Sequence, residues 1–391
     1  MTRFGDLPDA SSARPLRELA AVFLKLGVIG FGGPAAHIAL MRGELVDRRR
    51  WLSGEQFLDL IGAANLIPGP NSTEVAIHVG RLRAGTPGLI VAGTAFILPA
   101  FCIVAAVGWA YQRVGRLPAT AAVMHGITPV MIVIVLQALA GLSRTAVKSV
   151  WWAVVGAVAL VAALTRVLDE VQILAIVGTG AGAIVWLRIR KVRREARSLL
   201  APLWMLGVAP AVQGATAATP VALWPLFLVF AKAGALLFGS GYVLLAFLRT
   251  DLVERLGWLT NAQLLDAIAV GQATPGPVFT TATFIGYNLA GMTGAVVATV
   301  GIFLPAFVFV AISAPFIAVM RRSPVAGAVL DGVNVASLAL MGAVTFALAR
   351  DALTSAGAVA IAAVAAVLLF RYRVNPTILI LGGAIAGLLL L

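Results

Sequence analysis

The sequence feature that most constrains this chain is a helix-breaking Pro-Gly-Pro motif that occurs twice inside apolar sequence, at 68–70 and at 275–277. Each copy follows a capping box, a Ser or Thr with a Gln three residues later, which begins at Ser53 and at Thr260. A helix from Ser53 to Pro68 would rise roughly 22 Å, less than the roughly 30 Å of a bilayer's hydrocarbon core. The break is therefore expected inside a membrane, and its recurrence 207 residues on indicates a duplicated chain.

The composition agrees with this placement. Of the 391 residues, 61% are hydrophobic and 12% are charged, whereas soluble proteins have about 25% charged residues. The apolar runs are long and do not alternate as barrel strands do. We therefore predict an all-α, polytopic membrane fold, built from two homologous and inverted repeats with Gly/Pro-broken helices. Apolar runs of near-spanning length cover 19–41, 56–79, 88–111, 118–142, 149–165, 171–187, 223–248, 263–287, 293–319, 325–348, 354–370 and 375–391.

The repeat also divides the chain. We expect a cytoplasmic or surface tail at 1–18 that is not a cleaved signal peptide, and a first membrane repeat at 19–187. A basic linker at 188–222, with room for an extra span, leads to a second membrane repeat at 223–391. Basic residues fall in alternate loops, which favours the cytoplasmic side for those loops. Two span counts satisfy this pattern, and both invert the second half: six spans per half plus one in the linker, or five per half with re-entrant Pro-Gly-Pro hairpins.

Several function classes are excluded. The net charge of +13 comes from basic residues scattered through short loops, which argues against nucleic-acid binding. Cys102 is the only cysteine, so the chain has no intrachain disulfide or multi-thiolate metal site. The Gly-rich string at 30–35 nominally fits a dinucleotide fingerprint, but it contains a proline and follows no strand. We predict no catalytic residue, cofactor or metal.

The Pro-Gly-Pro breaks themselves predict an anion site. Pro68 and Pro70 lack an N–H group, and Gly69 lets the chain turn through positive φ, so that a new helix starts at Pro70. The free N–H groups of Asn71 and its successors then point into the gap with the positive end of a helix dipole. The polar residues around both breaks could instead only satisfy backbone groups that the prolines leave free, and both roles stay open.

Each half also has a lysine before a glycine-rich break. Lys25 precedes the cluster 27–34, and Lys232, 207 residues on, precedes 234–241. Two such lysines related by a pseudo-twofold axis would suit a dianion; the alternative is that each snorkels to the membrane surface. The predicted substrate-binding residues are Lys25, Gly32, Gly33, Asn65, Pro68, Gly69, Pro70, Asn71, Ser72, Thr73, Lys232, Gly239, Ser240, Gln272, Pro275, Gly276, Pro277 and Thr280.

Ionisable residues near the first break suggest coupling to protons. Glu74 and His78 are one helical turn apart, and the second half has no ionisable counterpart. They could relay a proton, or His78 could face water near the loop. Asp59 and Asp266 recur early in matching helices, where a helix dipole or an Arg is expected to satisfy them. His37 is expected to be a satisfied interior residue.

The combined motifs resemble the chromate ion transporter family in its two-domain form. They cover about 19–142 and 226–348, and the matching stretches are Phe23–Gly27, Gly30–Pro34, Arg48–Leu52, Pro68–Pro70 and Leu98–Phe101, with echoes at Phe230, Phe238-Gly239, Trp258, Pro275–Pro277 and Leu304–Phe307. The resemblance implies a multi-pass transporter in the bacterial cytoplasmic (inner) membrane that exports chromate and confers resistance, with sulfate as a look-alike oxyanion. A homodimer is left open. Ser240 stands where the first half has Gly33, and Val278-Phe279 replaces Asn71-Ser72, so the second half is expected to bind less.

The alternative function is a membrane-embedded enzyme that acts on a lipid phosphate. Such enzymes can also use inverted repeats and phosphate-binding helix ends. That chemistry would require a positioned acid or nucleophile with an arginine at membrane depth. Every arginine of this chain falls in or near a loop, which counts against it. A non-transporting scaffold would not need matched helix breaks.

Overall fold

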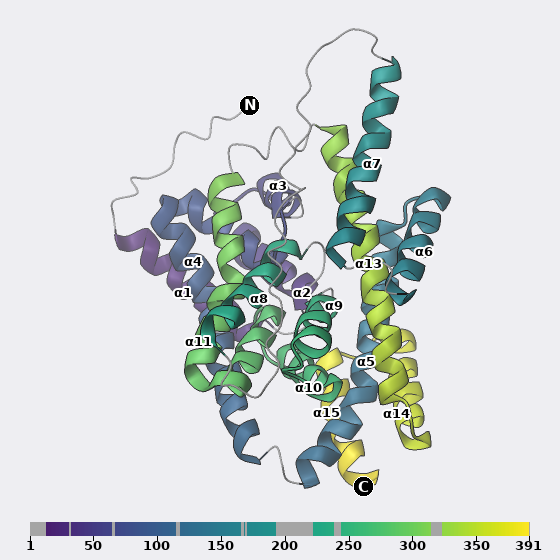
Figure 1. Ribbon diagram of the computed structural model, residues 1–391. Coiled ribbons are helices and arrows are strands. Elements are labelled where there is room, and N and C mark those ends of the chain that lie inside the picture. The colour runs from purple at the N-terminus through teal and green to yellow at the C-terminus, as the bar shows by residue number, and fades with distance from the viewer. Residues whose placement is uncertain are drawn as a thin grey trace.

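The computed structural model describes residues 13–30, 33–64, 67–114, 118–165, 168, 170–192, 222–237, 244–313 and 323–390. All regular structure in these ranges is helical, which confirms the predicted fold class (Figure 1). Most of the predicted tail and linker lies outside the described residues. So do four predicted site residues, Gly32, Asn65, Gly239 and Ser240.

The two halves contain matching series of helices. The first half comprises α1 (Ala13–Ile29), α2 (Gly33–Arg42), the π-helix η1 (Gly43–Arg48), α3 (Gly54–Ala64), α4 (Asn71–Val114), α5 (Pro118–Ala146), α6 (Val150–Thr165) and α7 (Glu170–Val192). The second half comprises α8 (Leu223–Leu236), α9 (Leu244–Leu248), η3 (Arg249–Arg255), α10 (Asn261–Ala273), η4 (Val278–Thr280), α11 (Thr281–Ser313), α13 (Pro324–Ala352), α14 (Ala356–Ala366), η5 (Val367–Arg371) and α15 (Pro376–Leu390). In these residues, four stretches within α4, α5, η4–α11 and α13 are long and apolar enough to cross a membrane.

Both capping boxes form as predicted. The backbone N–H of Gln56 donates to Ser53 Oγ at 3.1 Å, and the Gln56 side chain accepts from the Ser53 N–H at 2.9 Å. Thr260 and Gln263 make the same reciprocal pair at 3.2 and 2.9 Å. These bonds satisfy donors that the first turn of a helix leaves free, and so they fix where α3 and α10 begin.

The segment after each Pro-Gly-Pro turn folds back on itself. Inside α4 the backbone turns sharply at Ala84 and at Gly85, where φ is +60°, and Gly80 then packs so closely on Gly88 that a Cβ on Gly80 would lie 2.2 Å from the Gly88 carbonyl oxygen. The stretch from Asn71 to this turn rises roughly 20 Å, too short to cross. The first Pro-Gly-Pro break thus lies between two short helical stretches, α3 and the start of α4, as the alternative with re-entrant hairpins predicts. The same kink recurs in α11 at Ala290–Gly291.

The equivalent helices α4 and α11 pack on each other and run antiparallel. Gly93 on α4 lies against the ring of Phe307 on the long arm of α11, and Gly108, further along α4, lies against Tyr287, which is beside the kink where that arm begins. Two equivalent helices that run in opposite directions are related by an axis across their length. The second repeat is thus inverted relative to the first, as predicted.

The peripheral helices are exchanged between the halves. In Figure 1, α13 of the second half runs beside α6 and α7 of the first, while α5 of the first half packs on α14 and α15 of the second. Glycines allow the close approach, since Gly126 of α5 faces Gly383 and Gly387 of α15. At the equivalent position, Gly332 of α13 faces Ala181 of α7. Small residues at such contacts let helices approach closely in a lipid bilayer. There, the apolar lipid tails leave no hydrophobic driving force for helix association.

We expect Gly126→Ala to lower the stability of the protein, because the added Cβ would lie 2.0 Å from the backbone oxygen of Gly383. Overpacking of this kind costs about 1–3 kcal/mol. Gly141→Ala on the same helix is the matched control, since nothing lies within 4 Å of its Cβ position and Ala favours a helix. The apparent Tm in detergent should fall only for Gly126→Ala, and equal Tm values for the two variants would contradict the exchanged packing.

Candidate functional site

The two Pro-Gly-Pro turns are each held by the opposite half. The N–H of Gly69 donates to the carbonyl oxygen of Leu237 at 2.7 Å, and the N–H of Gly276 donates to that of Gly30 at 2.8 Å. Gly30 and Leu237 are equivalent positions, 207 residues apart, where α1 and α8 end. The four breaks in the hydrophobic segments therefore meet in two pairs, and each pair joins one half to the other.

Glycine is required at both turns. Gly69 has a φ of +143° and Gly276 a φ of +95°, values that side chains other than hydrogen rarely allow. A Cβ on Gly276 would lie 2.7 Å from the Cβ of Ala100, and one on Gly69 would lie 3.4 Å from the Cβ of Ala306. Ala100 and Ala306 belong to the repeated Leu-Pro-Ala-Phe motif. The motif thus places a small residue, Ala100 or Ala306, against the Pro-Gly-Pro turn of the other half.

His37 links the glycine-rich break at the end of α1 to the start of α4. The ring is buried, with 2% of its surface exposed, and with Nε2 protonated it donates to the Gly30 carbonyl at 2.9 Å. Its Nδ1 then accepts from the Ser72 hydroxyl at 3.2 Å. The expectation of a satisfied interior histidine is confirmed. The second half has Leu244 at the equivalent position, so the break that follows α8 lacks this polar link.

Several buried polar atoms near the start of α4 have no hydrogen-bond partner. Thr73 and Glu74 are both fully buried, and neither Thr73 Oγ1 nor either carboxyl oxygen of Glu74 makes a hydrogen bond. The Glu74 side chain folds back over the turn, since its Oε1 lies 2.2 Å from where a Cβ on Gly69 would be. Buried polar groups are normally paired, so these atoms are candidates for contact with a ligand or a proton.

His78 lies one helical turn beyond Glu74 on the same helix. Its side chain is 4% exposed, and its Nε2 has no hydrogen-bond partner. The alternative that His78 faces water near the loop is therefore wrong. Arg81, the charged residue nearest in sequence, turns away and donates to the carbonyl oxygens of Val310 and Ala311.

Three threonine hydroxyl groups at the second break bond backbone carbonyls of the same segment. Thr280 donates to the Pro277 carbonyl at 2.8 Å, Thr281 to the Val278 carbonyl at 2.8 Å, and Thr274 to the Val270 carbonyl at 2.6 Å. Gln272 is buried and lies beside a small cavity. These hydroxyl groups bond backbone carbonyls around the prolines. Thr280 therefore already has a partner that competes with its predicted role in binding an oxyanion.

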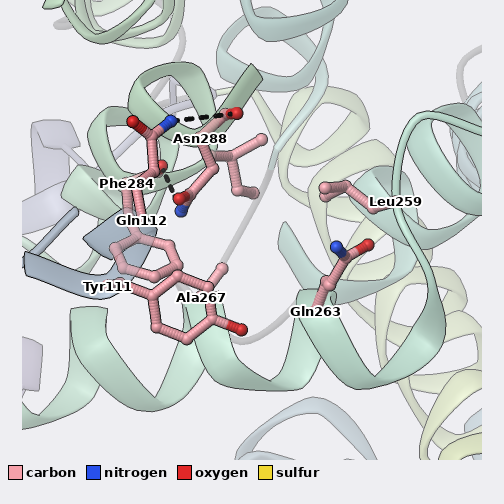
Figure 2. Close-up of a pocket in the computed structure, with 8 residues that line it drawn as sticks. Tyr111, Gln112, Leu259, Gln263, Ala267, Phe284 and Asn288 are labelled. Atoms are coloured by element: carbon pink, nitrogen blue, oxygen red, sulfur yellow. Dashed lines mark hydrogen bonds between the residues drawn. The ribbon is translucent and has the colours of Figure 1, made fainter. Parts of the chain in front are cut away.

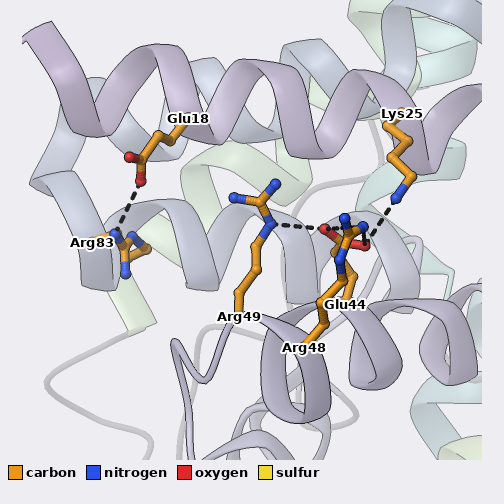
Figure 3. Close-up of polar contacts among 6 residues, drawn as sticks. All are labelled: Glu18, Lys25, Glu44, Arg48, Arg49 and Arg83. Atoms are coloured by element: carbon orange, nitrogen blue, oxygen red, sulfur yellow. Dashed lines mark hydrogen bonds and ion pairs between the residues drawn. The ribbon is translucent and has the colours of Figure 1, made fainter.

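Both predicted lysines are paired with buried carboxylates. Lys25 Nζ lies 2.9 Å from Glu44 Oε2, and Arg48 and Arg49 bond the same carboxylate (Figure 3). In the second half, Lys232 Nζ lies 3.0 Å from Asp251 Oδ2. Neither ammonium group is free to pair with an anion in this conformation.

Glu44 and Asp251 were not singled out from the sequence. They lie on η1 and η3, each 19 residues after its lysine, and that repeated spacing was the available signal. Hydrogen bonds from Arg49 and Lys25 lower the pKa of Glu44 to about 2, so this carboxylate stays ionised near neutral pH. These clusters fix the surface helices against α1 and α8.

One cavity is lined by none of the residues of the four helix breaks. It has a volume of about 470 Å³ and lies between the end of α4 and the helices α10 and α11 (Figure 2). Tyr111 at its wall donates to Asp266 Oδ2 at 2.7 Å. The expectation that a dipole or an arginine satisfies Asp266 is thus incomplete, because a tyrosine from the other half is its partner. The cavity is lined by Tyr111, Gln112, Leu259, Gln263, Ala267, Phe284, Ile285 and Asn288.

We expect Gly276→Ala to destabilise the protein more than Gly257→Ala. Both glycines have positive φ, so each substitution costs about 1–2 kcal/mol in backbone strain. Only Gly276 is also crowded, whereas nothing lies within 4 Å of the Cβ position on Gly257. A larger drop in apparent Tm and in the monodisperse fraction for Gly276→Ala is the expected result. Equal losses in the two variants would mean that close packing around the Gly276 turn adds little to stability beyond the effect of its backbone angles.

Comparisons with known proteins agree with the duplicated architecture. A family model described as "Chromate transporter" matches twice, at residues 17–186 and 224–388. The chain is 33% identical over 389 residues to a "Chromate transport protein" of Cupriavidus metallidurans, covering 95% of this chain and 92% of that one. A "Chromate transport protein" of Pseudomonas aeruginosa is also 33% identical, with coverage of 95% and 91%. A "Probable chromate transport protein" of Synechococcus elongatus is 34% identical, with coverage of 87% and 86%. No solved structure gives a significant match.

Proposed function

The chain belongs to the chromate transporter family, and from this premise we propose that it is a secondary transporter that exports chromate, and also sulfate, across the bacterial cytoplasmic membrane. The relatives are named as transport proteins and the chain is not an enzyme, so the lipid-phosphate alternative is set aside. Export of chromate would confer resistance to it. The predicted segments 1–18, 19–187, 188–222 and 223–391 are kept as proposed boundaries, and a homodimer as a proposed assembly.

The observation that carries the proposal is the meeting of helix breaks from the two halves beside the unpaired hydroxyl of Thr73. The start of α4 offers backbone N–H groups and the positive end of a helix dipole. A tetrahedral oxyanion needs several donors and little space, which suits such a helix end. We place the substrate there, with Asn71, Ser72 and Thr73 as its principal contacts.

We propose that the two halves divide the work. The first break has the unpaired Thr73 hydroxyl, whereas the hydroxyl of its counterpart Thr280 already bonds the Pro277 carbonyl. The second break then mainly shapes the site through its backbone. Lys25 and Lys232 remain candidate ligands, but recruiting either would break its ion pair with Glu44 or Asp251, a carboxylate that also pairs with arginine. Binding through the helix end requires no such separation.

The membrane potential can drive the proposed export. Moving one charge across 100 mV is worth about 2.3 kcal/mol, so a dianion leaving a negative-inside cell gains about 4.6 kcal/mol. Proton coupling through Glu74 or His78 is compatible with this scheme, but export does not require it.

The proposed function predicts chromate flux that follows an imposed potential. Purified protein in proteoliposomes, with no pH gradient, should move labelled chromate toward the positive side. Reversing the potential should reverse the net flux, and sulfate in excess should compete. Empty liposomes are the control. Absence of both chromate and sulfate flux from well-folded protein would overturn the proposal.

We expect Thr73→Val to weaken chromate binding while Thr280→Val has little effect. Both changes remove a hydroxyl at equivalent positions, but only Thr73 Oγ1 lacks a partner in the protein. A hydrogen bond to a charged group is worth about 1.5–3 kcal/mol. The Kd for chromate should therefore rise roughly 10- to 100-fold in Thr73→Val. Equal effects in the two variants would show that the first break holds no special role.

A further inference from the structure

The carboxyl group of Glu74 lies where the proposed substrate would bind. Glu74 is fully buried near the start of α4, and its Oε1 lies against Gly69 at the Pro-Gly-Pro turn. A negative charge at this end of a helix is favoured by the same partial charges that favour an oxyanion. Both carboxyl oxygens lack a hydrogen-bond partner in the protein, so the group is not fixed there by side-chain bonds.

The surroundings of Glu74 do not neutralise it. On its own helix, His78 has an unpartnered Nε2 and Arg81 bonds carbonyl oxygens of α11. From α2, His37 is held between Gly30 and Ser72. Other ionisable groups of the packed elements already have partners: Lys25 of α1 and Lys232 of α8 pair with acids, Glu18 of α1 pairs with Arg83, and Asp266 of α10 accepts from Tyr111. The packed elements also carry Tyr287 of α11 and the exposed Arg17, Arg42, Glu55, Asp59 and Arg113.

The second half has no such group. Thr281 stands at the position equivalent to Glu74, and its hydroxyl bonds the Val278 carbonyl at 2.8 Å. Of these two equivalent positions, only the one beside the first Pro-Gly-Pro turn therefore carries a carboxyl group. A carboxylate with a purely structural role would be expected to have partners, as Glu44 has.

We propose that Glu74 is a tethered competitor of the transported anion, which occupies the helix end when ionised and leaves it to the substrate when protonated. This rests on the proposed function, because the competitor needs an anion that binds at the start of α4. An ionised carboxylate repels an arriving dianion over a few ångströms of dry protein. Once protonated, the carboxyl group is neutral and can donate a hydrogen bond.

The consequence is a linkage between proton and anion. Binding of one dianion is accompanied by uptake of up to one proton from water onto a carboxyl oxygen of Glu74, and no other bond is made or broken. Because such coupling is reciprocal, chromate affinity must rise as proton concentration rises. Glu74 then sets the pH dependence of transport even when the potential supplies the driving force.

The test measures binding of labelled chromate to purified protein over the alkaline range in which chromate stays a dianion. In the wild type, the Kd should rise up to tenfold per pH unit wherever Glu74 is ionised in the free protein. In Glu74→Gln, which cannot ionise, the Kd should not change with pH. Thr281→Val is the matched control at the equivalent position and should keep the wild-type slope. Sulfate, as a second dianion, should behave in the same way.

A second measurement does not depend on the folding of any variant. Adding chromate to wild-type protein in weak buffer should take up as much as one proton per anion bound, read with a pH indicator. A pH-independent wild-type Kd without proton uptake, or an unchanged slope in Glu74→Gln, would overturn the competitor while potential-driven flux still supported the transporter. Failure of the wild type both to bind and to move chromate or sulfate would overturn the proposed function itself.

Discussion

The structure depends on a pair of backbone hydrogen bonds exchanged between the halves. In a membrane, a backbone N–H without a partner costs several kcal/mol, and the Pro-Gly-Pro turns cannot find partners within their own helices. Gly69 and Gly276 donate instead to the carbonyl oxygens of Leu237 and Gly30. Neither half can therefore complete its own break. The exchanged peripheral helices extend the same dependence, since α5 and α13 pack mainly on helices of the opposite half.

The two halves share their backbone conformation at the breaks, but the side chains at equivalent positions differ. The kinks at Gly85 and Gly291 have φ values of +60° and +62°, so the duplicated conformation is closely kept. At equivalent positions, however, the side chain of Glu74 lies over the turn of the first half, whereas that of Thr281 lies against Gly271 and donates to the Val278 carbonyl. The conformation is needed twice because each half holds the other. A single binding site needs only one set of donors, so the second set is free to become apolar or locally satisfied.

The ion pairs correct the way in which charge was first interpreted. Two lysines beside two breaks suggested two positive charges for a dianion, yet each has an acid partner 19 residues later. Each carboxylate also pairs with arginine, so the lysines belong to charge clusters that hold η1 and η3 against α1 and α8. What remains at the breaks is mostly neutral: backbone donors, hydroxyl groups and one carboxyl group. A site of this kind can hold an anion without holding it too tightly to release it.

The sequence by itself determined the helical class, the duplication, the places where helices break and the capping boxes at Ser53 and Thr260. These follow from local chemistry, namely proline without an N–H, glycine at positive φ and apolar runs of spanning length. It also indicated inversion through the alternation of basic loops. Only the tertiary structure decided that each turn bonds the opposite half, that the lysines pair with acids and that Thr280 is satisfied while Thr73 and Glu74 are not. Those facts depend on contacts between residues far apart in the chain, such as Gly69 with Leu237 and Tyr111 with Asp266, whose pairing no local pattern encodes.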